Sequence, residues 1–135
     1  MRLTQEQIIE FCHNNTIIDY LGIEVIPTDD GGVQLELSVD AQHTNYCNIC
    51  HGGVLTTMAD TAMGAACLML DKKVVTISMT IEFMHSVPMT TRLIADAKVL
   101  HNGHQTMVCE CNMINAEGKL FSKVHATFFV LELVE

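Results

Sequence analysis

The stretch at residues 52–70, GGVLTTMADTAMGAACLML, constrains the fold most, because it is almost wholly apolar or small and contains one ionisable residue, Asp60. Its large apolar side chains recur at steps of three and four residues, which is the period of an α-helix. Such a helix is apolar on nearly all sides, so we expect the rest of the chain to cover it. A carboxylate in these surroundings is costly unless a partner or a raised pKa compensates. Asp60 is therefore a candidate functional residue.

His51, Gly52 and Gly53 lie where this helix should begin. The first N–H groups of a helix lack internal partners and carry the positive end of the helix dipole, and glycine lets a ligand approach the backbone closely. Such an N-terminus can polarise a carbonyl group or bind an anion. For His51 we favour an orienting role, in which its ring hydrogen-bonds to neighbouring backbone groups.

Asp60 lies eight residues after Gly52. In an α-helix this separation is about 12 Å along the axis and about 80° around it. The two features therefore cannot act on one carbonyl group from the same helix. A second copy of the chain, with its helix running in the opposite direction, would bring them together. The sequence thus predicts an active site that is shared across a homodimer.

The segment HGGVLTTMADTA, together with the upstream Asn45, resembles the hotdog-fold acyl-CoA thioesterases of the phenylacetate-degradation and 4-hydroxybenzoyl-CoA type. The shared pattern is an Asn, then His-Gly-Gly six residues later, then an acidic residue nine residues beyond the His. The resemblance covers roughly residues 22–130. Two departures are Asn48, where these proteins usually carry glycine, and the segment 84–89, which looks one residue longer than usual.

The resemblance implies an α+β fold in which a curved antiparallel sheet of about six strands wraps around one long central helix. It also implies a hydrolase that converts an aromatic or medium-chain acyl-CoA into a free acid and coenzyme A without a metal or a cofactor. The active sites would be shared within homodimers, and two dimers would form a tetramer.

The resemblance also suggests a role for individual residues. Asp60 of one subunit would be the nucleophile or the general base, and both roles stay open. The N–H group of Gly52 or Gly53 of the other subunit would bind the carbonyl oxygen. Asn45 and Thr76 would position a water molecule or the carboxylate. Strand alternation puts Ser78 on the same face as Thr76, so Ser78 is the alternative hydroxyl.

The rest of the chain reads as one domain over residues 1–135, with the central helix at residues 52–70. Capping signals and alternating patterns predict the other elements: a helix at residues 4–14, a one-turn helix that ends at Gly22, a hairpin turned at residues 29–32, and strands at residues 75–83, 92–101, 104–115 and 120–131. The dipeptide Asn102-Gly103 predicts a two-residue type I′ turn.

The net charge of -9 argues against nucleic acid and against anionic membranes as general partners. Residues 52–70 are long enough for a membrane span, but Asp60 and the Thr and Gly positions argue against one. The N-terminus lacks the pattern of a signal peptide, so we expect a cytoplasmic protein whose six cysteines are reduced thiols. A hydrophobic content of 49% and nine Met favour further burial in an oligomer.

Other functions fit parts of the sequence. Cys47, Cys50 and His51 match the haem-attachment pattern CxxCH, and with His43 they could bind zinc, although we favour ordinary thiols in a loop. A dehydratase acting on 3-hydroxyacyl thioesters would need a His and an acid aimed at one substrate, and the proline-rich loop of such enzymes is missing. A non-catalytic acyl-CoA-binding protein is the third alternative, but it would gain nothing from the carboxylate of Asp60.

Overall fold

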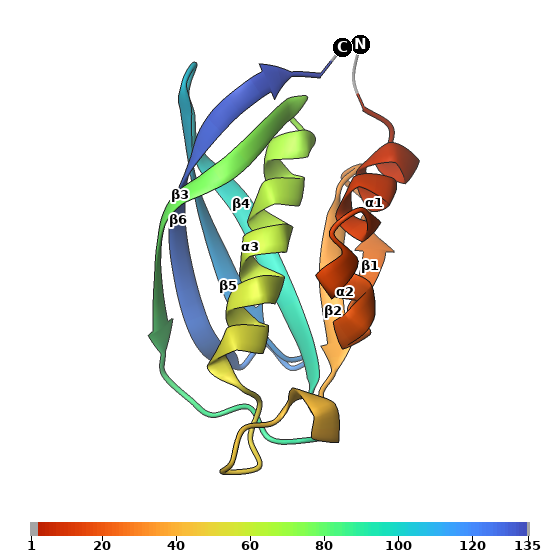
Figure 1. Ribbon diagram of the computed structural model, residues 1–135, viewed down its shortest axis with the longest axis vertical. Helices are drawn as coiled ribbons and strands as arrows, with labels where there is room; N and C mark the ends of the chain where they lie inside the picture. The colour runs from red at the N-terminus through yellow and green to blue at the C-terminus, as the bar shows by residue number, and fades with distance from the viewer. Residues whose placement is uncertain (1–2, 135) are drawn as a thin grey trace.

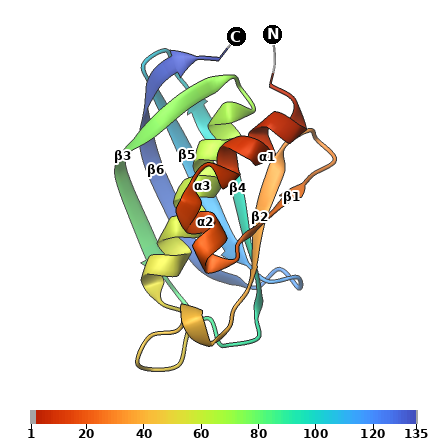
Figure 2. The ribbon, with the colours of Figure 1, turned by 45° about the vertical axis from the view of Figure 1, so that its right-hand side comes forward.

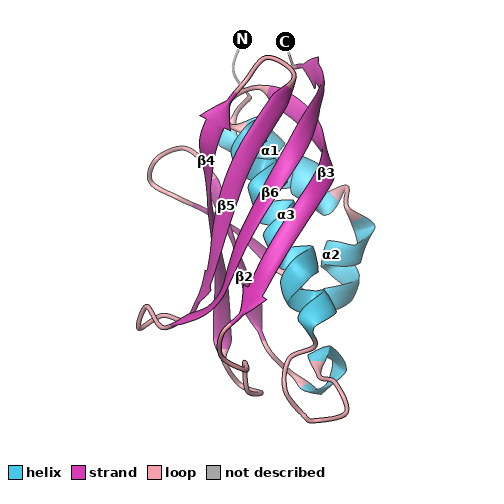
Figure 3. Ribbon diagram, turned by 90° about the vertical axis from the view of Figure 1, so that its left-hand side faces the viewer, coloured by secondary structure: helices cyan, strands magenta, loops and turns pink. Residues whose placement is uncertain are grey.

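The computed structural model describes residues 3–134 and has an α+β architecture in which one antiparallel sheet curves around a central helix, α3 (Gly52–Leu68) (Figures 1 and 3). The strand order in the sheet is β1-β2-β4-β5-β6-β3. The strands are β1 (Glu24–Pro27), β2 (Val33–Ser38), β3 (Lys72–Phe83), β4 (Arg92–Asn102), β5 (Thr106–Ile114) and β6 (Leu120–Leu133). The wrapped helix predicted from the apolar stretch is confirmed.

Two shorter helices precede the sheet, as the capping signals predict. Helix α1 (Gln5–His13) starts with a capping box, because the N–H of Gln7 donates to Thr4 Oγ1 at 3.1 Å and the N–H of Thr4 donates to Gln7 Oε1 at 2.8 Å. Helix α2 (Thr16–Leu21) ends at Gly22, whose φ of 71° favours glycine. Helix α1 crosses in front of α3 in Figure 2 and also packs against β1 and β2.

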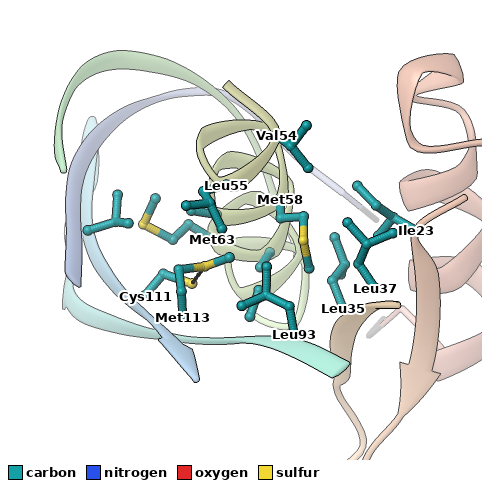
Figure 4. Packing of buried hydrophobic residues seen from close by; sticks show 14 of the residues in the cluster. Ile23, Leu35, Leu37, Val54, Leu55, Met58, Met63, Leu93, Cys111 and Met113 are labelled. Atoms are coloured by element: carbon teal, nitrogen blue, oxygen red, sulfur yellow. Dashed lines mark hydrogen bonds between the residues drawn. The ribbon is translucent and has the colours of Figure 1, made fainter. Parts of the chain in front are cut away.

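The hydrophobic core lies between α3 and the concave face of the sheet (Figure 4). Met58 and Met63 of α3 are fully buried, and Met58 points toward Leu35 and Leu37 of β2 (Figure 4). Each such side chain contributes about 1.5–3 kcal/mol when it leaves water. These contacts fix α3 on the sheet. The residues on the other faces of α3 contact α1 or line the candidate site.

The edge strand β3 departs from the alternation that the sequence predicts. Thr76 pairs with Phe128 and Ser78 pairs with Thr127, so Ile77 is an extra residue in a β-bulge. Because cross-strand partners share a face and Phe128 is buried against α3, Thr76 faces the helix. Ser78 lies on the opposite face with Thr127, and the prediction that both hydroxyls share one face is wrong.

The turn between β4 and β5 also differs from its prediction. Asn102 pairs with Met107, and neither Asn102 nor Gly103 has the positive φ that a type I′ turn requires. A bulge between Val99 and His101 shifts the register, so residues 103–105 form a longer loop. The N–H of Gly103 donates to Thr106 O at 3.0 Å, and a Cβ at this glycine would overlap the same oxygen.

No helix within residues 3–134 combines the length and the hydropathy that a membrane span would need.

Candidate active site

The N-terminus of α3 is capped by a side chain. His51 is the N-cap residue, and its Nδ1 accepts a hydrogen bond from the N–H of Gly53 at 2.8 Å. The Gly53 donor is therefore already used, whereas no acceptor within residues 3–134 takes the N–H of Gly52. The structure thus distinguishes the two glycines, because only the Gly52 donor is left for a ligand.

The ring of Phe83 lies close to the Cα atom of Gly52. A Cβ built on Gly52 would lie 3.1 Å from Cζ of Phe83, whose ring covers the start of the helix. Position 52 therefore has little room for a side chain, a constraint that the sequence did not reveal because Phe83 lies far along the chain.

Asn45 lies beside Gly52 in one surface hollow of about 300 Å³, which we call the helix-start hollow and which His85 also lines. Asn45 Oδ1 accepts from the N–H groups of Cys47 at 2.9 Å and Ile49 at 3.4 Å. Because both partners are N–H donors, the side-chain atom of Asn45 that binds them must be the oxygen. The NH₂ group of Asn45 takes no part in these two bonds. That group has no acceptor within the described part of the chain. The hollow thus brings together two predicted site residues, and both offer N–H donors.

The loop that carries Asn45 is held in place by His43, a role that the sequence reading missed. His43 is buried; its Nδ1 accepts from the N–H of Asp40 at 2.9 Å, and its Nε2 therefore carries the proton and donates to Leu21 O at 2.6 Å. Its carbonyl oxygen accepts from the N–H of His51 at 2.7 Å. Asp40 and His43 form a capping box, but with His in place of the usual Glu or Gln the signal is hard to recognise.

The same loop explains one departure from the family pattern. Asn48 has a φ of 62°, in the left-handed region that glycine adopts most readily and that Asn tolerates better than most residues. Asparagine can therefore replace the usual glycine here, although this conformation has a higher energy for asparagine than for glycine.

The cysteines of this loop do not form a metal site. Cys47 is exposed, whereas Cys50 is buried, and burial raises the pKa of its thiol to about 11. His43 uses both ring nitrogens in hydrogen bonds. Within residues 3–134 no three His, Cys, Asp or Glu side chains are grouped so that they could hold a metal ion.

Asp60 occupies a second site further along α3. Its side chain is half-buried, and Oδ1 accepts a hydrogen bond from Thr76 Oγ1 of β3. The two residues lie in a groove of about 380 Å³ between α1, α3, β3 and β6, which we call the acid groove. The hydroxyl that donates to Asp60 is thus that of Thr76, whereas Ser78 lies on the other face of the strand.

The helix-start hollow and the acid groove have no lining residue in common. They lie at different levels of α3, about 12 Å apart along the axis at 1.5 Å per residue. One protomer therefore holds a free backbone donor in one place and a hydrogen-bonded carboxylate in another. Chemistry that needs both groups at one carbonyl requires a second protomer.

Comparison with known proteins identifies the family of this chain. The thioesterase superfamily matches residues 48–122. The acyl-coenzyme A thioesterase PaaI of Escherichia coli K12 is 35% identical over 106 residues, which cover 78% of this chain and 76% of that protein. The structure of the E. coli PaaI protein from the phenylacetic acid degradation operon matches with a TM-score of 0.79 at 32% identity, covering 87% of this chain and 89% of that one. A hypothetical thioesterase from Streptococcus pneumoniae, solved with coenzyme A, matches with a TM-score of 0.77 at 26% identity, covering 84% and 91%.

Proposed function

The chain belongs to the thioesterase superfamily, and from this membership we propose that it hydrolyses acyl-CoA thioesters to a free acid and coenzyme A. The observation that carries the proposal is the pair of half-sites on α3, a free N–H at Gly52 and a carboxylate at Asp60. A thioester hydrolase needs both, because one polarises the carbonyl group and the other supplies or activates the attacking oxygen.

In the proposed mechanism the thioester carbonyl oxygen accepts the N–H of Gly52 at the positive end of the α3 dipole, and the NH₂ group of Asn45 adds a second donor nearby. His51 acts through Gly53, because its cap holds the first turn in place. The electrophilic carbon then faces Asp60 of the partner subunit. Thr76 keeps that carboxylate oriented by its hydrogen bond.

Two routes lead to the same products. As a nucleophile, Asp60 forms a mixed anhydride while the C–S bond breaks and coenzyme A leaves as a thiolate, and water then hydrolyses the anhydride. As a general base, Asp60 takes a proton from water while the water oxygen attacks, and the departing thiolate finally receives a proton. Both routes use the same residues, and neither requires a metal ion.

The homodimer that we propose forms through β3. This strand is an edge of the sheet, and its exposed Val75 and Ile77 favour pairing with another chain. On β3, Thr76 lies beside Asp60 of α3, and Phe83 lies beside Gly52 of α3. Antiparallel pairing with Thr76 opposite the partner's Phe83 would set the twofold axis between residues 79 and 80 and bring each carboxylate to the partner's helix start.

We further propose that two such dimers associate into a tetramer. Helix α2 lies on the side of the molecule away from β3 (Figure 1). Its exposed Ile17 and Tyr20 offer a second apolar surface. Analytical ultracentrifugation tests the assembly, because the sedimenting mass separates dimers from tetramers.

The expected compartment is the cytoplasm, where all six cysteines would stay as the free thiols that the structure contains.

The activity itself is tested by thiol release from acetyl-CoA, hexanoyl-CoA and phenylacetyl-CoA, with wild type and Asp60→Asn compared side by side. The variant keeps the size of the side chain and an acceptor for Thr76 but removes the charge. We expect wild type to turn over at least one substrate and Asp60→Asn to lose about 10²- to 10⁴-fold in kcat. Binding of acyl-CoA without any thiol release by wild type would instead support the non-catalytic alternative.

A further inference from the structure

The helix-start hollow holds one polar side chain to which the proposed mechanism gives no role. His85 lines this hollow together with Gly52 and Asn45. Its side chain is exposed, and no residue within the described part of the chain forms a hydrogen bond or an ion pair with its ring. The ring is therefore available to a ligand that enters the hollow.

The backbone on both sides of His85 is held by hydrogen bonds. The N–H groups of Met84 and His85 both donate to Phe121 O of β6, at 2.9 and 3.0 Å. Further along the chain, Val87 O accepts from the N–H of Cys50 at 2.8 Å, next to the start of α3. These bonds connect the segment to β6 and to the loop before α3. The position of His85 at the hollow thus depends on main-chain contacts, and its side chain remains free to act.

Among the described lining residues of the hollow, His85 is the one that can exchange a proton near neutral pH. The other titratable residue there is Cys50, and burial raises the pKa of its thiol to about 11. A histidine ring ordinarily changes its charge between about pH 5 and 8, so it can hold a proton and release it under the same conditions. The hollow therefore combines N–H donors for a carbonyl oxygen with one potential proton donor.

The proposed reaction needs such a donor at the sulfur atom. When the C–S bond breaks, its electron pair goes to sulfur, and an alkyl thiolate must then receive a proton. In the nucleophile route, the carboxylate of Asp60 carries no proton that it could give. Because sulfur and oxygen are bonded to the same carbon, a carbonyl oxygen on the N–H of Gly52 places the sulfur in or beside the hollow that His85 lines.

We infer that His85 is a catalytic residue that protonates the departing sulfur of the acyl-CoA. The inference rests on the proposed thioesterase function and adds the residue that supplies the proton. The N–H of the imidazolium ring gives its proton to sulfur as the C–S bond breaks, which yields the free thiol of coenzyme A and a neutral ring. The ring takes a proton from solvent before the next turnover. His85 and Gly52 act from one protomer, whereas the carboxylate comes from the partner.

The test compares three phenylacetyl thioesters that differ in their leaving group. Coenzyme A and N-acetylcysteamine are both alkyl thiols, but N-acetylcysteamine lacks the nucleotide and the phosphates. The third leaving group, 4-nitrothiophenol, departs as a stable thiolate that needs no proton. General acid catalysis typically contributes about 10²- to 10⁴-fold, and a thiol is already a good leaving group. We therefore expect His85→Gln to lower kcat/KM about 10- to 100-fold for the two alkyl thioesters and less than about twofold for the aryl thioester.

The pattern of losses separates proton donation from other roles of His85. A loss with the coenzyme A thioester alone would mean that the ring binds the nucleotide portion of the substrate. Equal losses with all three thioesters would mean that the ring acts through the structure. Either result, or unchanged rates in all three assays, would overturn the inference and leave the thioesterase function standing. Absence of thiol release by wild type from every thioester would overturn the function and the inference together.

His104→Gln is the matched control, because His104 is an exposed histidine in the loop between β4 and β5 and lines neither the hollow nor the acid groove. This control is expected to keep the wild-type rates, and circular dichroism reports folding of each variant. His85→Ala provides an independent variant, in which added imidazole is expected to restore part of the lost rate with the alkyl thioesters. A folded His85→Ala protein that is as active as wild type, or that imidazole does not restore, would contradict proton donation by the ring.

Discussion

The two half-sites on α3 are built in different ways. The helix-start hollow is lined by two short segments, residues 45–55 and 83–87, and the hydrogen bonds of Asn45 and His51 at its edge are local. The acid groove is formed by α1, α3, β3 and β6, and its Asp60–Thr76 hydrogen bond joins residues of two elements. The first site depends on backbone conformation, whereas the second depends on tertiary packing.

This difference shows how a small domain can hold the donor and the carboxylate of one reaction at two separate places. Each half-site is formed within one protomer, but neither contains both the carbonyl-binding donor and the carboxylate. Antiparallel association of two copies would join a hollow to a groove twice, once on each side of the twofold axis. Single substitutions can disturb each half-site separately.

Gly52→Pro should damage the helix-start hollow most, because proline removes the free N–H. Proline is tolerated at the first position of a helix, and the φ of -64° and ψ of 135° at His51 suit a residue that precedes proline. We expect kcat for thiol release to fall about 10²- to 10³-fold.

Gly52→Ala is the matched control for this prediction, since it also places a Cβ against Phe83 but keeps the N–H. Its kcat should fall much less than that of the proline variant. Equal losses in the two variants would mean that crowding against Phe83, and not the donor, limits activity.

Thr76→Val should weaken the acid groove without emptying it, because valine keeps the shape and loses the hydroxyl that donates to Asp60. Because the lost hydrogen bond is made to a charged group, we expect kcat to decrease about tenfold. Steady-state kinetics should show near-normal activity for Thr76→Ser and for Ser78→Ala. A large loss in Ser78→Ala would contradict the assignment of the two hydroxyls to opposite faces.

His51→Ala should act on stability more than on chemistry, because it removes the acceptor for the N–H of Gly53. Loss of an N-cap typically lowers the free energy of unfolding by about 1 kcal/mol. Urea denaturation at fixed protein concentration measures this change. Asparagine is a good N-cap residue, so His51→Asn should restore most of the loss, and failure to do so would argue for another role of the ring.

The local half-site could be predicted better than the tertiary one. The capping box at Thr4 and the glycines at the start of α3 are visible in the sequence, because neighbouring residues decide these structures. The contact of Asp60 with Thr76 followed from the family pattern, whereas the β-bulge at Ile77 that separates Thr76 from Ser78 left no recognisable signal.

Tertiary contacts account for the remaining differences. The place of Phe11 in the wall of the acid groove depends on how α1 crosses α3, and the covering of Gly52 by Phe83 depends on β3. The dipeptide Asn102-Gly103 favours a tight turn locally, but a bulge in β4 shifts the register and overrides that preference. Local propensity is a weak guide wherever the pairing of distant segments sets the geometry.

We propose that each active site takes Gly52 from one protomer and Asp60 from the other. The direct measurement is the thiol-release rate of an equal mixture of Gly52→Pro and Asp60→Asn chains, unfolded and refolded together. Random pairing gives half mixed dimers, each with one intact site of two, so the account predicts about a quarter of the wild-type rate. A mixture no more active than the separate variants would contradict the shared site.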